Sequence, residues 1–111
     1  MNNRQKQEYI TINDNKRKYI DPMTSNKVNV VNLDTGNTLE HELKKAEIAY
    51  KLIQEGHTIL TEAKLLNGKK PDIMILSLSN PIIYEIMVSE TDERCDSKDY
   101  LGIRIIKVKT K

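Results

Sequence analysis

The clearest periodic signal in the chain is an apolar series with helical spacing between residues 37 and 56. Its members are Leu39, Leu43, Ala46, Tyr50 and Ile53. These side chains fall on one side of a helix with about 3.6 residues per turn. Asn37 stands where an N-cap residue is expected, Glu40 follows three positions later, and Gly56 comes directly after the series. The pattern predicts an amphipathic helix that starts near Asn37 and ends at Gly56.

Strand-like runs follow the expected helix. They comprise residues 57–65, 72–77 and 82–88. The links between them are short, which predicts two antiparallel hairpin connections. Thr91 can begin a short polar helix that reaches toward Tyr100, and residues 103–108 are typical of a last strand, which the long connection allows to run parallel to an earlier one. We therefore expect an α/β fold with a small mixed sheet, in the order helix, three-strand antiparallel meander, helix, strand.

The first part of the chain, residues 1–37, is polar and rich in Asn and Lys. Two short stretches alternate between apolar and polar residues, at 9–12 and 28–33, and predict one or two edge strands. The first eight residues contain too little apolar surface to order themselves. We expect an N-terminal extension over residues 1–37 and an α/β core over residues 38–111.

Composition limits what this core can be. The chain has 111 residues, of which 38% are apolar, and contains no Phe or Trp, so one compact domain with a thin core is the limit. A lone cysteine, Cys95, excludes an internal disulfide and a cysteine-based zinc fold. The polar start has no secretory signal, and no run is long enough to span a bilayer, so we expect a cytoplasmic protein without a membrane partner. The net charge of +2 does not by itself indicate nucleic-acid binding.

Two carboxylates are predicted to face each other in the second hairpin. A turn centred near residue 79 sets Asp72 nearly opposite Glu85, with their Cβ atoms about 5 Å apart if they share a face. Two carboxylates that close repel one another unless a proton or a cation lies between them. Mg²⁺ suits such a pair because it takes oxygen ligands from one or two carboxylates and completes its shell with water and phosphate.

The helix and the first hairpin are expected to add charged groups to this pair. Projection of the helix places Glu42 at the edge of the apolar stripe, pointing toward the sheet. The first hairpin, if centred near residue 68, sets Lys64 opposite Asp72 with Glu62 on the same face. Further along that face lie Leu60, Met74, Leu76 and Ile83. We therefore expect a sheet face packed on the helix, with a charged cluster at one end.

The order of these motifs resembles the PD-(D/E)xK nuclease superfamily, which has the restriction-endonuclease-like fold. The similarity is greatest to its CoiA-like competence-protein and archaeal or viral nuclease-like group, and it covers residues 40 to 89. The matching residues are His41-Glu-Leu-Lys44, Gly56, Glu62, Asp72-Ile73 and Glu85-Ile86-Met87-Val88-Ser89. The resemblance implies a DNA nuclease in which Asp72 and Glu85 hold Mg²⁺ or Mn²⁺ and Glu42 assists. The ion would polarise the scissile phosphate and activate a water molecule.

One position departs from the family pattern. Met87 stands where most members have Lys and some have Gln, and a thioether neither donates a hydrogen bond nor carries a charge. Lys64 is the candidate replacement because of its expected place beside Asp72. Two other lysines, Lys44 and Lys98, are further candidates for that role.

Basic residues near the first turn suggest a contact with the phosphate backbone. Lys69 and Lys70 flank that turn, and with Lys44 and Lys98 they form the predicted nucleic-acid-binding set. DNA is the expected partner, although RNA fits the same chemistry. The thin core also makes a homodimer plausible, in which two sites would address two strands.

Other interpretations remain open for each residue. Asp72 is also typical of a turn residue after Pro71, and Glu42 can equally pair with Lys45 on the helix surface. His41 projects away from the apolar stripe and is expected in solvent. The alternative function is a nuclease-fold module that has lost its chemistry and binds nucleic acid or a protein. A structural protein without a metal is a third.

Overall fold

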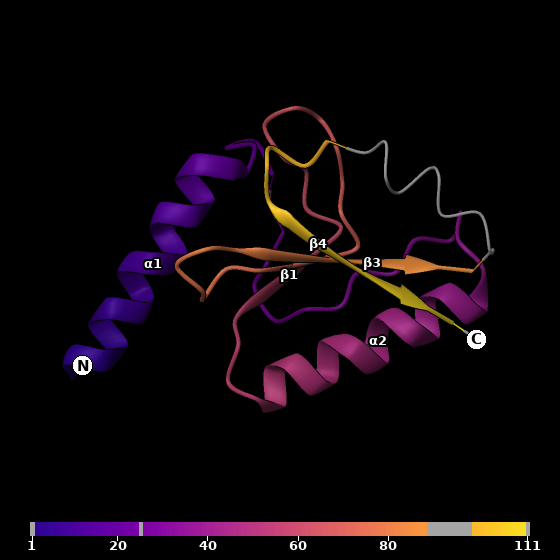
Figure 1. Ribbon diagram of the computed structural model, residues 1–111, viewed down its shortest axis with the longest axis horizontal. Coiled ribbons are helices and arrows are strands. Elements are labelled where there is room, and N and C mark those ends of the chain that lie inside the picture. Colours follow the sequence, from indigo (N-terminus) through magenta and orange to yellow (C-terminus); the bar gives the residue numbers. More distant parts are fainter. Residues whose placement is uncertain (1, 25, 89–98, 111) are drawn as a thin grey trace.

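A four-stranded mixed sheet and two helices make up the fold (Figure 1). The computed structural model describes residues 2–24, 26–88 and 99–110. The elements are α1 (Asn3–Tyr19), α2 (Leu39–Gln54), β1 (Ile59–Thr61), β2 (Ile73–Ile75), β3 (Ile82–Met87) and β4 (Arg104–Lys109). The strands lie in chain order, β1–β2 and β2–β3 are antiparallel, and β3–β4 is parallel. The expected α/β class, the antiparallel meander and the parallel last strand are confirmed. The short helix expected after Thr91 falls largely outside the described residues.

The N-terminal part is a helix, so the prediction of strands at 9–12 and 28–33 is wrong. Asn2 caps α1 in a capping box with Gln5, whose side chain accepts from the Asn2 backbone N–H at 3.0 Å. Residues 9–12 alternate in polarity, but they lie between runs of Gln, Lys, Arg and Glu, which favour a helix. The capped end also orders residues that were expected to lack structure. Residues 28–33 form no strand in the described chain.

A buried asparagine attaches α1 to the sheet. The Asn15 side-chain amide donates to the backbone carbonyls of Leu76 and Leu78, each at 2.8 Å. Both acceptors lie in the connection after β2, so α1 sits at that end of the sheet (Figure 1). In the part of the chain that the structure describes, neither helix is long and apolar enough to cross a membrane.

Helix α2 is present as expected, but it is rotated relative to the predicted face. Thr38, rather than Asn37, caps the helix by accepting from the His41 backbone N–H at 3.1 Å. Gly56 follows the helix with a φ of 93°, a conformation that glycine adopts without strain. The buried residues of the helix are His41, Glu42, Lys45, Ala49 and Leu52. The expected stripe of Leu39, Leu43 and Tyr50 is exposed.

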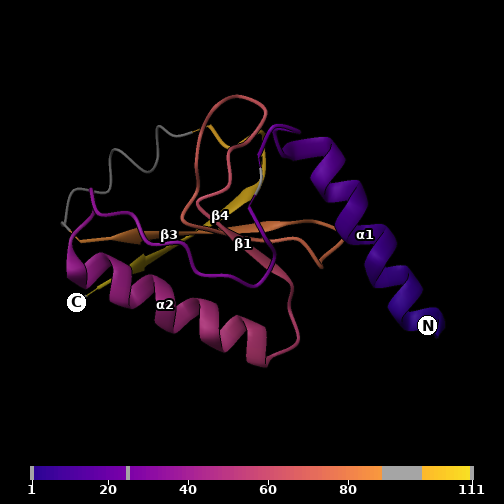
Figure 2. The ribbon, with the colours of Figure 1, turned by 180° about the vertical axis from the view of Figure 1, so that it is seen from behind.

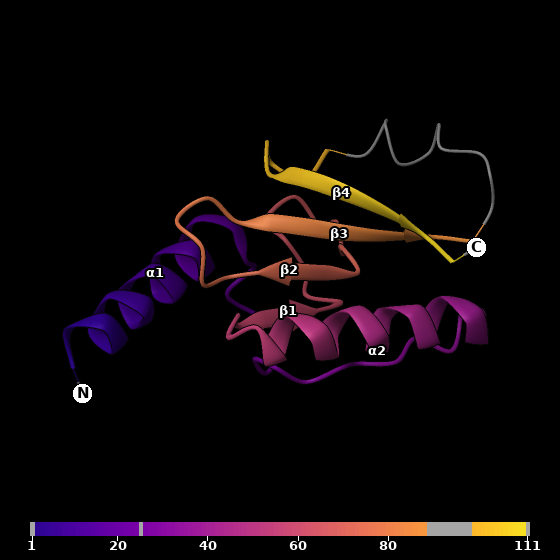
Figure 3. The ribbon, with the colours of Figure 1, turned by 60° about the horizontal axis from the view of Figure 1, so that its bottom comes forward.

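The sheet separates two apolar clusters. Helix α2 packs on the face that carries Ile59, Ile73 and Ile75. The opposite face carries the side chains that were predicted to contact the helix: Leu60, Met74, Leu76 and Ile83. These four instead pack with Ile20, Tyr100 and Ile103, so the predicted face is wrong. Figure 3 shows α2 lying along only one side of the sheet.

The segment between the helices covers the free edge of β1. Asn29 makes a pair of hydrogen bonds with Ile59, one from its backbone N–H (2.8 Å) and one to its side-chain oxygen (2.9 Å). The Asn32 backbone N–H donates to Thr61 Oγ1 at 2.8 Å, and that hydroxyl donates to the Val30 carbonyl at 2.8 Å. Figure 2 shows this segment crossing the molecule beside β1.

Candidate functional site

Asp72 and Glu85 face each other where β2 begins beside β3. The register pairs Ile73 with Tyr84, so the preceding residue, Asp72, continues the ladder opposite Glu85. The Asp72 backbone N–H donates to Glu85 Oε1 at 3.1 Å, and the Ile86 N–H donates to Asp72 Oδ2 at 2.8 Å. Each carboxylate therefore accepts a backbone hydrogen bond from the opposite strand. The predicted neighbourhood of the two acids is confirmed.

The first turn of α2 adds a histidine to the two acids. His41 Nε2 lies 3.3 Å from Asp72 Oδ2, and His41 Nδ1 lies 2.9 Å from Glu42 Oε1. His41 is only 8% exposed, so the expectation of a solvated histidine is wrong. The cause is the rotation of α2, which turns His41 toward the sheet and Leu43 toward solvent.

A buried lysine joins the helix to the end of β1. Lys45 Nζ lies 2.6 Å from Glu42 Oε2 and 3.0 Å from Glu62 Oε1, and the lysine side chain has no exposed surface. The i,i+3 pair of Glu42 with Lys45 was one interpretation of the sequence. That interpretation placed the pair on the helix surface, whereas the structure buries it. The signal for burial was the spacing of His41, Lys45 and Ala49, which lie four residues apart on one helix face.

Glu42 has four hydrogen-bonding partners in the site. Besides Lys45 and His41, the Asp34 backbone N–H and the Asn37 side-chain amide each donate to it at 3.0 Å. Burial acts to raise the pKa of Glu42, but the Lys45 ammonium and these other donors outweigh it and lower that pKa to about 2. Glu42 is therefore ionised throughout the ordinary pH range. Its contacts hold the start of α2 against the preceding segment and against Lys45.

Asp72 has the opposite electrostatic character. Burial and the nearby charge of Glu85 raise the pKa of Asp72 to about 6, although the bond from the Ile86 N–H and the charge of His41 oppose the shift. Burial also raises the pKa of Glu62, against the ion pair with Lys45. Burial acts to lower the pKa of Lys45, but Glu42 and Glu62 raise it overall, so the lysine stays charged. Negative charge at Asp72 is thus unfavourable without a counter-charge.

These groups open into a polar pocket of about 400 Å³. Its lining residues are Asp34, Asn37, His41, Glu62, Lys70, Asp72, Glu85 and Ile86. A second polar pocket, of about 320 Å³, shares Asp34, Glu62 and Lys70 with it. The two pockets form a continuous polar surface on which Lys70 is placed beside the acids, as a cation that has access to solvent.

Lys64 does not lie where the sequence predicted. The Glu62 N–H donates to the Asp72 carbonyl at 3.2 Å, so Glu62 and not Lys64 is opposite Asp72. The strand ends at Thr61 because Glu62 has a φ of 54°, which turns the chain out of the sheet. Lys64 Nζ instead lies 3.9 Å from Asp21 Oδ2, with half of the lysine side chain exposed.

The other lysines predicted to bind nucleic acid are dispersed. Lys44 lies on the outer flank of α2, 3.7 Å from Glu47, and does not line the acid pocket. Lys69 is exposed in the turn of the first hairpin, one residue before Lys70. Lys98 lies outside the described residues. Of this set, only Lys70 lines the described pocket with Asp72 and Glu85.

Met87, which stands at the motif position of lysine, is buried at the end of β3. Its backbone carbonyl accepts from the Thr110 N–H at 3.0 Å. The residue therefore belongs to the core, and its thioether supplies neither charge nor a hydrogen-bond donor.

The donor chemistry of the acid pair fits a small divalent cation. Asp72 and Glu85 offer carboxylate oxygens on the wall of a polar pocket, which is what Mg²⁺ and Mn²⁺ prefer, with water completing the shell. Among the described residues, no three His, Cys, Asp or Glu side chains converge as a ready metal-binding group.

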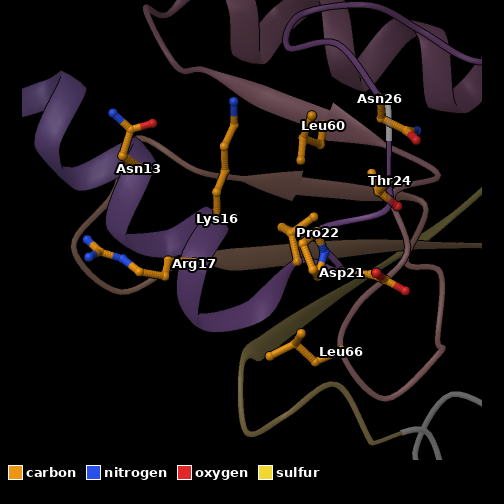
Figure 4. Close-up of a pocket in the computed structure, with 10 residues that line it drawn as sticks. Asn13, Lys16, Arg17, Asp21, Pro22, Thr24, Asn26, Leu60 and Leu66 are labelled. Carbon is orange, nitrogen blue, oxygen red and sulfur yellow. The ribbon is translucent and has the colours of Figure 1, made fainter.

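A larger pocket, which we call the α1 pocket, lies between the end of α1 and β1 and has a volume of about 540 Å³ (Figure 4). Leu60 and Leu66 give it apolar walls, and Lys16 and Arg17 come from α1. Asp21 is the acid on its wall, and it faces Lys64. This pocket shares no lining residue with the acid pocket and has no pair of carboxylates.

Comparison of the chain with protein-family models, with curated proteins and with solved structures finds no match. The site itself combines two facing acids, a histidine between helix and sheet, a buried lysine and an accessible lysine in the pocket.

Proposed function

We propose that this chain is a small Mg²⁺- or Mn²⁺-dependent nuclease with a restriction-endonuclease-like core that hydrolyses phosphodiester bonds of DNA. The observation that carries the proposal is the Asp72–Glu85 pair, buried, facing across two strands and opening into a polar pocket. The raised pKa of Asp72 supports it, because burial and the charge of Glu85 both disfavour the ionised carboxylate, and a bound divalent ion would supply the missing counter-charge.

Asp72 and Glu85 would hold the ion. When bound, it supplies Lewis-acid polarisation of a phosphate oxygen and a water molecule of lowered pKa. The backbone N–H groups of Ile86 and Asp72 orient the two carboxylates, since each donates to one of them. His41 fixes Asp72 from the side of the helix. Glu42 assists by fixing His41, and Lys45 holds Glu42 against Glu62.

Lys70 is the best replacement for the lysine that the family motif has at the position of Met87. It lines the pocket of Asp72 and Glu85, is exposed, and carries a positive charge that can meet a phosphate. Lys64 is a weaker candidate than the sequence suggested because it faces Asp21. Lys45 is a positioning residue, since its side chain is buried between two glutamates.

A second candidate is a module of the same fold that binds nucleic acid without cleaving it. The burial of Met87 favours it, because a side chain packed in the core at that position leaves the motif without its usual cation. In that case Lys70 and the polar pocket would bind phosphate, and the acid pair would hold a structural ion.

The two candidates are separated by a cleavage assay with matched variants. Purified protein is incubated with Mn²⁺ and plasmid, single-stranded DNA, a branched junction or RNA. The nuclease cuts at least one of these, and Asp72→Asn lowers the rate by about a hundredfold or more. Asp14→Asn is the control. Asp14 lies on α1, where it pairs with Arg17, so this variant should cleave DNA like the wild type.

Calorimetry completes the comparison. The nuclease and the binding module both take up Mn²⁺, and Glu85→Gln abolishes the uptake. If the protein binds DNA in a salt-dependent way but does not cleave it even at large protein excess, the second candidate is correct and the nuclease is excluded. Absence of both metal binding and cleavage in the wild type would refute both candidates.

A further inference from the structure

Helix α2 carries an apolar stripe on the side that faces away from the sheet. Leu39 is 75% exposed, Leu43 61% and Tyr50 62%, and Ala46 lies between the last two along the helix. At about 100° per residue, Tyr50 lies about 20° from Leu43, whereas the buried Leu52 lies on the opposite side of the helix. We call Leu39, Leu43, Ala46 and Tyr50 the outer stripe.

Such a stripe is unusual on a helix that already buries its other face. Helices that carry apolar side chains on both faces are normally covered on both sides, and contiguous exposed apolar surface marks interaction sites. Figure 3 shows that the sheet covers only one side of α2. Tyr50 is also held in place, because its hydroxyl accepts from the Gln54 side-chain amide at 2.8 Å.

The charges beside the outer stripe indicate what covers it. Glu40, Lys44, Glu47 and Lys51 follow one another along one flank, so the sign of the charge alternates. A shallow pocket of about 220 Å³ lies on this flank, lined by Glu40, Leu43, Lys44, Glu47 and Thr110. Within one chain, Glu47 lies 3.7 Å from Lys44 and 3.3 Å from Lys51.

Read in the opposite direction along the helix, this row of charges has the opposite sign at each position, so it is complementary to the same row on an antiparallel helix. An antiparallel second copy brings its Lys51 to Glu40 and its Glu47 to Lys44 across the interface. Within two residues of this register, Leu39 lies near Tyr50 of the second copy and Leu43 lies near its Ala46. In a parallel two-fold pair the same flank of each copy would lie on opposite sides of the interface, so the two rows of charges would not meet.

We infer that the outer stripe is the interface of a homodimer in which two α2 helices pack antiparallel about a two-fold axis between Leu43 and Ala46. The interface is isologous, because each copy contributes the same stripe. One helix face per subunit buries less than the roughly 1,200 Å² of a standard interface, so the dimer is weak. This inference does not rest on the proposed nuclease activity, because the outer stripe lies on the opposite side of α2 from His41 and Lys45.

Sedimentation velocity of the full chain, from about 10 µM to about 1 mM, tests the inference. The wild type shifts from monomer to dimer over that range. Leu43→Glu stays monomeric and keeps the unfolding midpoint that the wild type has at low concentration, because Leu43 is 61% exposed and belongs to neither apolar cluster. Met23→Glu is the control, since Met23 is 88% exposed but lies off α2. A wild type that is monomeric throughout, or a Leu43→Glu variant that still dimerises, would overturn the inference.

A charge exchange tests the antiparallel register. Lys44→Glu alone places acid against acid, and Glu47→Lys alone places base against base, so each variant dimerises about fivefold more weakly than the wild type. An equimolar mixture of the two restores opposite charges and returns the dimer to about wild-type strength. A mixture as weak as its components would overturn the register.

Discussion

Lys45 Nζ lies 2.6 Å from Glu42 Oε2, and the lysine side chain has no exposed surface. The same ammonium lies 3.0 Å from Glu62 Oε1. One positive charge is thus shared by two acids, one from the helix and one from the end of β1. This contact fixes the distance between α2 and the sheet at the point where the acid pocket opens.

Replacing Lys45 with Met should destabilise the fold by about 3 kcal/mol. The substitution keeps most of the side-chain volume but leaves Glu42 and Glu62 without their counter-charge in a buried place. Urea unfolding at neutral pH measures the change. Lys51→Met is the matched control and should change the free energy of unfolding by less than about 0.5 kcal/mol, because the Lys51–Glu47 pair is exposed. Equal effects of the two substitutions would contradict the burial of Lys45.

Asp72→Asn should stabilise the metal-free protein at neutral pH and not at acid pH. The folded state raises the pKa of Asp72 from 3.8 to about 6, so the folded state binds the proton more tightly than the unfolded state does. Stability is therefore lost as the pH rises from about 4 through about 6. Removing the charge should recover up to about 3 kcal/mol at pH 7.5.

The check is the difference in free energy of unfolding between Asp72→Asn and the wild type, measured with chelator across that pH range. Glu42, whose pKa is lowered to about 2, loses its stabilising contribution as the pH falls below about 4.5. That loss occurs in both proteins and cancels in the difference. A difference that does not depend on pH would contradict the raised pKa of Asp72.

Lys70→Met should weaken the function of the pocket without weakening the fold. Lys70 is exposed and lines the pocket of Asp72 and Glu85, so we expect cleavage to fall by about tenfold to a hundredfold while the unfolding midpoint stays constant. Lys64→Met serves for comparison, since Lys64 faces Asp21 instead. If Lys64→Met lowered cleavage more than Lys70→Met did, the assignment of the pocket cation would be reversed.

Asn15→Ala should loosen α1 from the sheet. The change removes two hydrogen bonds of 2.8 Å and leaves the carbonyls of Leu76 and Leu78 without that donor, at a cost of about 2 kcal/mol. Denaturant unfolding gives the stability, and amide exchange in α1 should become faster. Asn13 lies two residues away, on the wall of the α1 pocket. Asn13→Ala should leave the free energy of unfolding and the amide exchange rates in α1 nearly unchanged.

The second hairpin could be predicted because its register follows from a short link. Asp72 and Glu85 were placed opposite each other from turn length alone, and the pairing of Ile73 with Tyr84 confirms it. The prediction for the first hairpin was wrong by two residues, because its turn is centred at residue 67, where the Leu65 N–H donates to the Lys69 carbonyl, and not near residue 68. The polarity pattern does not locate the centre of a turn to one residue, so the place of Lys64 could not be obtained in that way.

The buried face of α2 was missed for a physical reason. A pattern of apolar residues locates a core that excludes charge, but the first two turns of α2 bury His41, Glu42 and Lys45 against other charged groups. The apolar Leu39 and Leu43 then point outward. At the N-terminus, capping by Asn2 and Gln5 stabilises a helix over residues whose alternation suggested a strand.

The segment that covers the edge of β1 also determines whether the sheet can pair with a strand of another polypeptide. Asn29 bonds the backbone N–H and carbonyl of Ile59, and the Asn32 side-chain amide donates to the Thr61 carbonyl, so an incoming strand would have to displace them before it could pair there. The opposite border is β4, where Arg104, Lys107 and Lys109 are exposed. Positive charge along an outer strand discourages fibril-like growth. Both borders of this small sheet are thereby protected against aggregation, one by asparagine side chains and the other by repulsion between cations.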